Sequence, residues 1–281
     1  MNTPRDHFIK IGTFNTRYWA EGSQGPPVIL VHGLGEHIEF WLANFSVLAE
    51  KHRVYAVDLP GHGRTDKFLK ASYEISDLAQ FVKDFMTALE IEHAHLVGHS
   101  LGGAIGTRLS LMYPAVVDKL VLVSSAGLGR EVSMMLRIPS IPLLGEMLLS
   151  RTSREGAENF AKVIMYDPAV MPEDFFELLY QMSLLPNRQK SFLKVLRASV
   201  NLFGQSKSLY SPKHIQGLPS ITKPVLAVWG RQDQFVPVAH AEVAAHNLPN
   251  VRVQIYDNCG HVPMLELPLS FNELLLEFLG H

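Results

Sequence analysis

The sequence has 281 residues, of which 47% are hydrophobic and 19% are charged, and its formal net charge is −2. This composition predicts a globular protein with a sizeable core and excludes an intrinsically disordered chain. The near-neutral charge gives no indication of a nucleic acid or an anionic membrane as partner.

The first 126 residues alternate apolar runs, typical of buried strands, with amphipathic segments of helical period. We expect an opening hairpin at 8–11 and 14–20, strands at 27–32, 54–58, 94–99 and 119–124, and helices at 40–50, 75–89 and 101–113. Strand and helix in this order predict an α/β fold with a mostly parallel, doubly wound sheet.

The alternation stops between residues 127 and 217, where only helical periodicity remains and six of the ten methionines lie. Strands resume at 224–229 and 251–256, and a helix ends the chain. We therefore predict a core formed by residues 1–126 and 218–281, with a helical cap or lid, 127–217, inserted between its two parts. The apolar segment 134–149 contains Pro139 and Pro142 and lacks a cationic face, so we expect it to pack on the active site as part of this lid.

Between the strand at 94–99 and the following helix stands Gly98-His99-Ser100-Leu101-Gly102, a G-x-S-x-G pentapeptide. In this context the pattern is typical of a nucleophile elbow, a turn so tight that only small residues fit on either side of the serine. The turn places Ser100 at a helix N-terminus, where backbone N–H groups can receive a developing oxyanion. Ser100 is therefore the candidate nucleophile.

A serine nucleophile needs a base to accept its proton and an acid to orient that base, here in the chain order Ser, Asp or Glu, His. Asp233 lies in the loop 229–237 and His261 in the loop 257–263, each directly after a predicted strand. Both loops belong to the sheet edge where Ser100 emerges, which is where open α/β sheets place their sites. Ser100, Asp233 and His261 are therefore predicted to form a catalytic triad.

The oxyanion hole is expected to consist of two backbone N–H groups, one from Leu101 and one from Leu34 in the loop after the third strand. Other polar residues near this edge have structural interpretations: we expect His32 and Asp58 to brace loops and His99 to pack under the elbow. Three further candidate bases precede the acid instead of following it in the chain: His32, His37 and His62.

Motifs along nearly the whole chain resemble those of α/β-hydrolase-fold enzymes. They are His32-Gly33, Asp58-Leu-Pro-Gly-His-Gly63, Gly98-His-Ser-Leu-Gly-Gly103, Gly230-Arg-Gln-Asp233 and Cys259-Gly-His261. The resemblance implies the α/β-hydrolase fold and a serine hydrolase, but it does not fix the substrate, because this superfamily hosts many chemistries.

Hydrolysis of carboxylic esters of small, largely apolar substrates through an acyl-enzyme on Ser100 is our leading prediction, because the Met-, Leu- and Phe-rich lid indicates an apolar pocket. The alternative is C–C bond hydrolysis of ring-opened aromatic compounds, 2-hydroxy-6-oxo-dienoates, whose hydrolases the chain resembles at 125–129, 166–168 and 230–237. Those enzymes carry an arginine beside an aromatic residue in a lid helix, where Leu179-Tyr180 stands here, and a tryptophan after the histidine, where Val262 stands. Losing the arginine removes a charge that holds a dicarboxylate-like substrate, so we favour the ester.

A third possibility is a non-catalytic sensor that binds a small ligand on the same scaffold. We expect no cofactor and no metal, since His240, His246 and His281 do not form a metal-binding spacing. Cys259 is the only cysteine, which excludes an intrachain disulfide, and we interpret it as a small buried hydrophobe. Without a signal-peptide pattern or an apolar run of about 20 residues, we expect a cytoplasmic protein that does not associate with membranes.

Overall fold

The fold is built on an eight-stranded, mostly parallel sheet, seen in a computed structural model that describes residues 3–150 and 153–280. The strand order is β1-β2-β4-β3-β5-β6-β9-β10, in which β1–β2 and β2–β4 pair antiparallel and the other neighbours pair parallel. The strands are β1 His7–Ile11, β2 Phe14–Glu21, β3 Pro27–Val31, β4 Arg53–Val57, β5 Ala94–His99, β6 Val117–Val123, β9 Val225–Gly230 and β10 Val251–Tyr256. This confirms the predicted α/β fold class.

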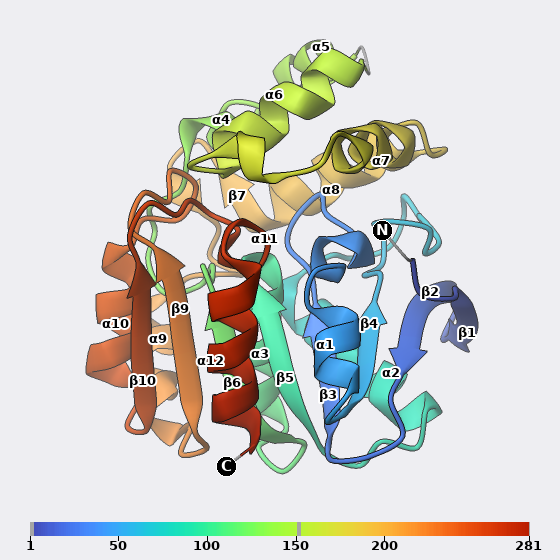
Figure 1. Ribbon diagram of the computed structural model, residues 1–281. Coiled ribbons are helices and arrows are strands. Elements are labelled where there is room, and N and C mark those ends of the chain that lie inside the picture. Colours follow the sequence, from blue (N-terminus) through green and yellow to red (C-terminus); the bar gives the residue numbers. More distant parts are fainter. Residues whose placement is uncertain (1–2, 151–152, 281) are drawn as a thin grey trace.

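Helices cover both faces of this sheet (Figure 1). They are η1 Ile38–Trp41, α1 Phe45–Ala49, α2 Ile75–Ala88, α3 Leu101–Met112, α9 Pro212–Gly217, η3 Leu218–Ser220, α10 Ala239–Asn247, α11 Pro263–Glu266 and α12 Pro268–Gly280. One face packs against α2, α3 and α10, and the other against α1, α11 and α12. In β3, Ile29 and Val31 lie on the face covered by α2, α3 and α10, while Val28 and Leu30 lie on the opposite face. Burial on both faces explains the uninterrupted apolar run.

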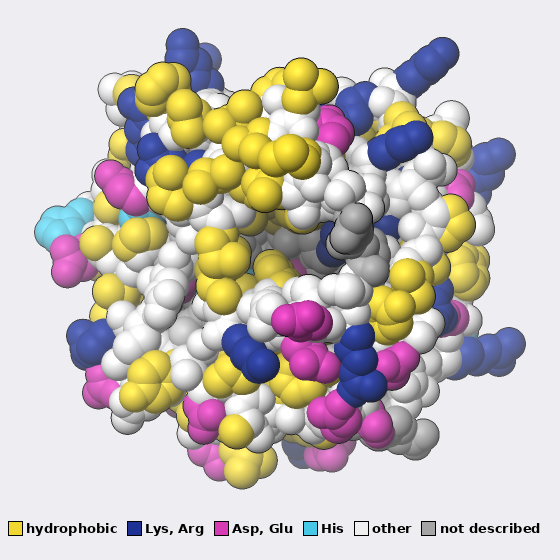
Figure 2. Space-filling model, turned by 90° about the horizontal axis from the view of Figure 1, so that it is seen from above, with side chains coloured by type: hydrophobic (Ala, Val, Ile, Leu, Met, Phe, Trp, Pro, Cys, Tyr) yellow, Lys and Arg dark blue, Asp and Glu magenta, His cyan; other side chains and the backbone are white. Residues whose placement is uncertain are grey.

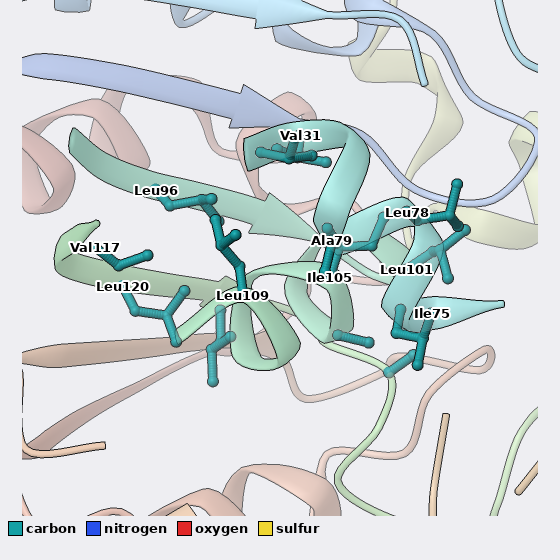
Figure 3. Close-up of a cluster of buried hydrophobic side chains, with 14 of the residues drawn as sticks. Val31, Ile75, Leu78, Ala79, Leu96, Leu101, Ile105, Leu109, Val117 and Leu120 are labelled. Atoms are coloured by element: carbon teal, nitrogen blue, oxygen red, sulfur yellow. The ribbon is translucent and has the colours of Figure 1, made fainter. Parts of the chain in front are cut away.

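The helix that follows the elbow is buried between the sheet and α2. Figure 3 shows Leu101, Ile105 and Leu109 of α3 close to Leu96 of β5 and Leu78 of α2. These side chains are at most 2% exposed. Fully burying a side chain of this size contributes roughly 1.5–3 kcal/mol, so the packing holds the N-terminus of α3 in a fixed place under Ser100.

A helical region lies over the carboxyl ends of the parallel strands (Figure 1). It comprises α4 Met134–Arg137, α5 Leu144–Leu148, α6 Arg154–Ile164, η2 Pro168–Val170, α7 Glu173–Ser183 and α8 Arg188–Ser199, followed by two short strands, β7 Val200–Asn201 and β8 Gly204–Gln205. Figure 2 views this side of the molecule, on which hydrophobic side chains gather and a hollow lies near the centre. In the described part of the chain no helix is long and apolar enough to cross a membrane.

Three expectations about local structure were wrong in part. The helix expected at 40–50 is two short helices, η1 and α1, because the buried Asn44 between them donates to Met264 O at 3.0 Å and to Asn272 Oδ1 at 2.8 Å. The region 127–217 is not only helical, since β7 and β8 pair in it.

The segment 134–149 buries fewer residues than expected. Pro139 and Pro142 lie between α4 and α5, which buries a single residue, Gly145, while α4 buries none. Leu136 is partly buried against core side chains, Ser140 is buried, and at the end of the segment Leu148 and Leu149 line a cavity.

Candidate active site

Ser100 lies in the sharp turn between β5 and α3 that the G-x-S-x-G pattern predicts. Its backbone has φ 51° and ψ −112°, a conformation that costs a non-glycine residue roughly 1–3 kcal/mol. A Cβ on Gly98 would stand 2.3 Å from the carbonyl oxygen of Gly102, and one on Gly102 would stand 2.2 Å from that of Val31. Only glycine fits at these two positions, and the close packing holds the serine in its strained conformation.

His261 and Asp233 meet at the edge of the sheet, on the loops that follow β10 and β9. His261 Nδ1 donates to Asp233 Oδ2 at 2.8 Å, and the two residues are 4% and 9% exposed. Asp233 Oδ1 accepts the N–H groups of Phe235 at 2.8 Å and Val236 at 2.9 Å. The carboxylate is thereby fixed, and the Nδ1 proton is committed to it, so Nε2 is the ring nitrogen left to accept a proton.

The loop that carries His261 is attached to the helical region. The His261 N–H donates to Ile164 O, at the end of α6, at 2.7 Å. Glu266 accepts the N–H of Gly260 at 2.8 Å and that of Tyr166 at 2.7 Å, which ties the two segments together. These contacts set the position of the imidazole relative to the helices above the sheet.

The surroundings of His261 raise its pKa above the ordinary histidine value. Burial alone would lower this pKa, but the charge of Asp233 and its hydrogen bond outweigh burial, and Glu36 and Glu266 act in the same direction. The protonated imidazole is therefore stabilised, as a base that holds a proton during a reaction requires.

His99 connects three loops of the site from beneath the elbow, where it was expected. Its Nδ1 contacts Glu36 Oε2 at 2.9 Å, and its Nε2 donates to the backbone oxygen of His261 at 2.9 Å. Glu36 Oε2 also accepts the Gly33 N–H at 2.7 Å. Burial would raise the pKa of Glu36, but His99 lowers it below the ordinary value, so the carboxylate is ionised. The loop after β3 and the loop of His261 are thus joined through one buried side chain.

The two expected oxyanion donors lie on either side of this connection. Leu34 precedes Gly35 in the loop after β3, and Leu101 begins α3. Neither N–H donates a hydrogen bond within residues 3–150 and 153–280. Two backbone donors without acceptors are what a developing oxyanion requires.

Three polar residues of the loops after β3 and β4, His32, Asp58 and His62, are held by local contacts. His32 Nδ1 donates to Gly33 O at 2.8 Å, and its Nε2 accepts the Leu59 N–H at 3.0 Å. Asp58 is fully buried and lies 3.3 Å from the guanidinium of Arg17. His62 Nδ1 donates to a backbone oxygen, that of Pro60, at 3.0 Å. These contacts brace the loops after β3 and β4.

We next considered Cys259 as a reactive thiol and the His, Cys, Asp and Glu side chains as metal ligands. Burial raises the pKa of the Cys259 thiol, which disfavours the reactive thiolate. Within the described ranges no group of three or more His, Cys, Asp or Glu side chains is placed to hold a metal ion.

A cavity of about 260 Å³ lies between the loop after β3 and helices α5 to α8. It is lined by Gly35, His37, Phe40, Leu148, Leu149, Ser153, Gly156, Ala157, Phe160, Leu179, Met182, Ser183, Arg188, Gln189 and Phe192. Ser100, Asp233 and His261 are not part of this wall. Two of its lining residues lie near the site. Gly35 follows Leu34, and the ring of Phe160 lies 6.2 Å from that of Phe235, which is stacked on His261 at 5.4 Å.

The sequence interpretation missed one charged residue in this wall, Arg188 at the start of α8. Its Nη2 donates to Gly35 O at 3.0 Å, and its guanidinium lies 5.1 Å from the centre of the Phe192 ring. Leu179, where the resemblance led us to look for an arginine, also lines the cavity, but from α7. The signal that could have found Arg188 is its spacing of four from Phe192, which places both on one helix face.

Comparisons with known proteins agree with this architecture. The family described as "alpha/beta hydrolase fold" matches residues 26–268. A 2-hydroxy-6-oxononadienedioate/2-hydroxy-6-oxononatrienedioate hydrolase of Paraburkholderia phymatum is 31% identical over 265 residues, which cover 92% of this chain and 88% of that protein.

Two solved structures align over almost the whole chain. A meta-cleavage product hydrolase from Pseudomonas fluorescens IP01 has a TM-score of 0.82 at 26% identity, covering 98% of this chain and 97% of that chain. A membrane phospholipase A, described as a bacterial virulence factor, has a TM-score of 0.82 at 26% identity, covering 98% and 86% of the two chains.

Proposed function

Since this chain belongs to the α/β-hydrolase fold family, we propose that it hydrolyses carboxylic esters of small, largely apolar substrates through an acyl-enzyme on Ser100. The observation that carries the proposal is the buried hydrogen bond of 2.8 Å between His261 Nδ1 and Asp233 Oδ2, at the sheet edge from which Ser100 emerges. A base fixed in this tautomer is what an activated serine needs.

In the proposed reaction His261 Nε2 takes the Ser100 hydroxyl proton as the serine oxygen attacks the ester carbonyl. The N–H groups of Leu101 and Leu34 receive the oxyanion, and Asp233 stabilises the imidazolium. His261 then returns the proton to the leaving alcohol. Water, deprotonated in turn by His261, cleaves the acyl-enzyme, releases the acid and restores Ser100.

The cavity beside the site supports a largely apolar substrate. Most of its lining is aliphatic or aromatic, with Phe40, Phe160 and Met182 among the side chains. Its volume, about 260 Å³, lies just below the range of roughly 300–1,000 Å³ for small-molecule pockets. A short acyl chain or a compact alcohol suits this space better than a long lipid chain.

The test combines a serine-directed fluorophosphonate probe with a series of p-nitrophenyl esters from acetate to decanoate. We expect Ser100 to be labelled in the folded protein, and turnover to show a chain-length optimum that the Ser100→Ala variant abolishes. Ester turnover that survives this substitution would point to another nucleophile. A folded wild-type protein that is neither labelled nor active would instead favour the ligand sensor.

A second candidate function is hydrolysis of a C–C bond in a ring-opened aromatic compound. It is favoured by the similarity to the Paraburkholderia hydrolase and to the meta-cleavage product hydrolase from Pseudomonas, whose names describe such reactions. The same protein preparation, given a 2-hydroxy-6-oxo-dienoate, separates the two candidates. Rapid loss of the dienone with slow ester turnover would reverse our preference.

A further inference from the structure

Arg188 carries a positive charge that no acidic residue neutralises. Within residues 3–150 and 153–280, no carboxylate forms an ion pair with its guanidinium; its contacts are the carbonyl of Gly35 and the ring of Phe192. Arg17, by contrast, is 1% exposed and lies within 3.3 Å of both Glu39 and Asp58. Arg188 is partly buried. Removing a cation even partly from water without a counter-charge is costly, so the difference between these two arginines needs a reason.

Arg188 keeps its charge at the cavity wall. Burial lowers the pKa of Arg188 to about 10, so it remains charged at neutral pH. No Asp or Glu is among the described residues that line the cavity. This part of the cavity wall therefore attracts an anion.

A second polar group at the same cavity lacks a partner among the described residues. His37 lines the wall and is 3% exposed. Its Nδ1 contacts Glu39 Oε2 at 2.7 Å, while its buried Nε2 has no hydrogen-bond partner in that part of the chain. A native protein seldom leaves such an atom unsatisfied. An oxygen atom of a ligand in the cavity is the kind of group that would pair with it.

We propose that Arg188 forms a carboxylate-binding subsite, so that the substrate carries an organic carboxylate on the part remote from the carbonyl attacked by Ser100. The inference rests on the proposed function and names its substrate class. The guanidinium has five N–H donors, and within 3–150 and 153–280 a single one of them, on Nη2, has an acceptor, at Gly35. The remaining donors suit a carboxylate, which an arginine binds with two parallel hydrogen bonds.

The position of the subsite fits a substrate that spans the cavity. Gly35 connects the proposed carboxylate subsite with the expected oxyanion hole. Its carbonyl contacts Arg188, and its neighbour Leu34 carries the expected oxyanion donor. A Cβ on Gly35 would stand 2.8 Å from the Phe192 ring, so only glycine allows α8 to approach the loop this closely. A substrate with an apolar middle could then place its carbonyl near Leu34 and its carboxylate at Arg188.

The first measurement is binding without turnover. Isothermal titration calorimetry on the Ser100→Ala protein compares hexanoate with hexanamide, which has the same length and no charge. We expect hexanoate to bind at least tenfold more tightly, and the added Arg188→Gln substitution to weaken hexanoate by about tenfold to a hundredfold while changing hexanamide less than threefold. Lys190→Gln removes a charge from an exposed position of the same helix and should change neither ligand. Arg188→Lys, which keeps the charge, should retain part of the preference.

The second measurement is turnover of two esters with the same six-carbon acyl chain, p-nitrophenyl hexanoate and mono-p-nitrophenyl adipate, which ends in a carboxylate. In the wild type we expect a higher kcat/KM for the adipate monoester, and Arg188→Gln should lower kcat/KM at least tenfold more for this ester than for the hexanoate, chiefly through KM. An equal loss for both esters would mean that Arg188 is only structural.

The outcomes separate the subsite from the proposed function. Equal binding of hexanoate and hexanamide by the Ser100→Ala protein overturns the subsite, even if esters are hydrolysed, and this comparison needs no substitution at Arg188. A second result is that hexanoate binding depends on Arg188 while the wild-type protein neither reacts with fluorophosphonate nor cleaves esters. That result supports the subsite and excludes the proposed ester hydrolysis.

Discussion

Replacing Asp233 by asparagine tests the central contact of the proposed site with little change in shape. Asp233 Oδ1 accepts two backbone N–H groups, at 2.8 and 2.9 Å, and an asparagine oxygen can keep both bonds. Its amide nitrogen would then face His261 Nδ1 at the position of Oδ2, 2.8 Å away in the native protein. An amide there donates to Nδ1 and holds the imidazole proton on Nε2, the wrong tautomer for a base that must accept a proton from Ser100.

The expected loss in kcat is about 10⁴-fold, the size of effect that a wrong tautomer produces in a triad. This corresponds to about 5 kcal/mol of transition-state stabilisation at 1.36 kcal/mol per tenfold. Stability should change far less, by about 1 kcal/mol or about 3 °C in Tm, because one charge-assisted hydrogen bond becomes a neutral one. The residual activity should also have its acid limb at lower pH, since the charge of Asp233 raises the pKa of His261 in the native protein.

The assay is hydrolysis of p-nitrophenyl butyrate between pH 5 and 9, with thermal unfolding measured on the same preparations. The matched control is Asp257→Asn, a substitution four residues before His261 at an exposed carboxylate that pairs with Arg231, and it should leave kcat unchanged. A fall in kcat below tenfold, or an acid limb that stays in place, would refute the assigned role of Asp233.

Three further outcomes follow from the same contacts. Wild-type kcat should rise with pH through a midpoint above about 6.5, because His261 acts when neutral and its pKa is raised above that ordinary value; a lower midpoint in the pH–rate profile contradicts this. Ser100→Gly should unfold at a higher temperature in calorimetry than Ser100→Ala, since glycine adopts a φ of 51° without a strain of roughly 1–3 kcal/mol; the reverse order argues against strain. Arg17→Met should lower the free energy of unfolding in urea by about 3–5 kcal/mol, because Asp58 and Glu39 stay buried without their cation; a loss below about 1 kcal/mol would show that they neutralise otherwise.

The sheet was predictable because its central strands are buried on both faces. The run at 94–99 becomes β5 with the same bounds: every residue of this strand is buried, and its sequence is mostly apolar apart from His95 and His99. The elbow was predictable for a related reason. Gly98 and Gly102 are required by contacts of 2.3 and 2.2 Å to neighbouring backbone, so the motif records a packing constraint in the sequence itself.

The features that sequence reasoning missed depend on contacts between distant segments. Asn44 interrupts the expected helix at 40–50 through hydrogen bonds to residues more than 200 positions away, and no local pattern contains that information. β7 and β8 have two residues each, too few to show an alternation of period two. In the sequence Arg188 is an ordinary charge at the start of a predicted helix, and only the fold shows that none of the described acidic residues pairs with it.

The contacts around the site divide it into a part that is rigidly coupled and a part that is free to vary. His99 joins the loop of Glu36 to the backbone of His261, so the expected oxyanion loop, the elbow and the imidazole are held as one unit inside the core. The cavity wall, in contrast, is formed mainly by side chains of α5 to α8, while the backbone of α6 holds the unit through the bond from the His261 N–H to Ile164 O. Substitutions of the cavity-lining side chains can therefore change what is bound while this backbone contact is kept. This is consistent with a phospholipase and a meta-cleavage product hydrolase each being 26% identical to one and the same chain. If the proposed subsite is correct, the charge of Arg188, on α8, is the wall feature that most affects substrate choice, because within the described residues no acidic side chain pairs with it.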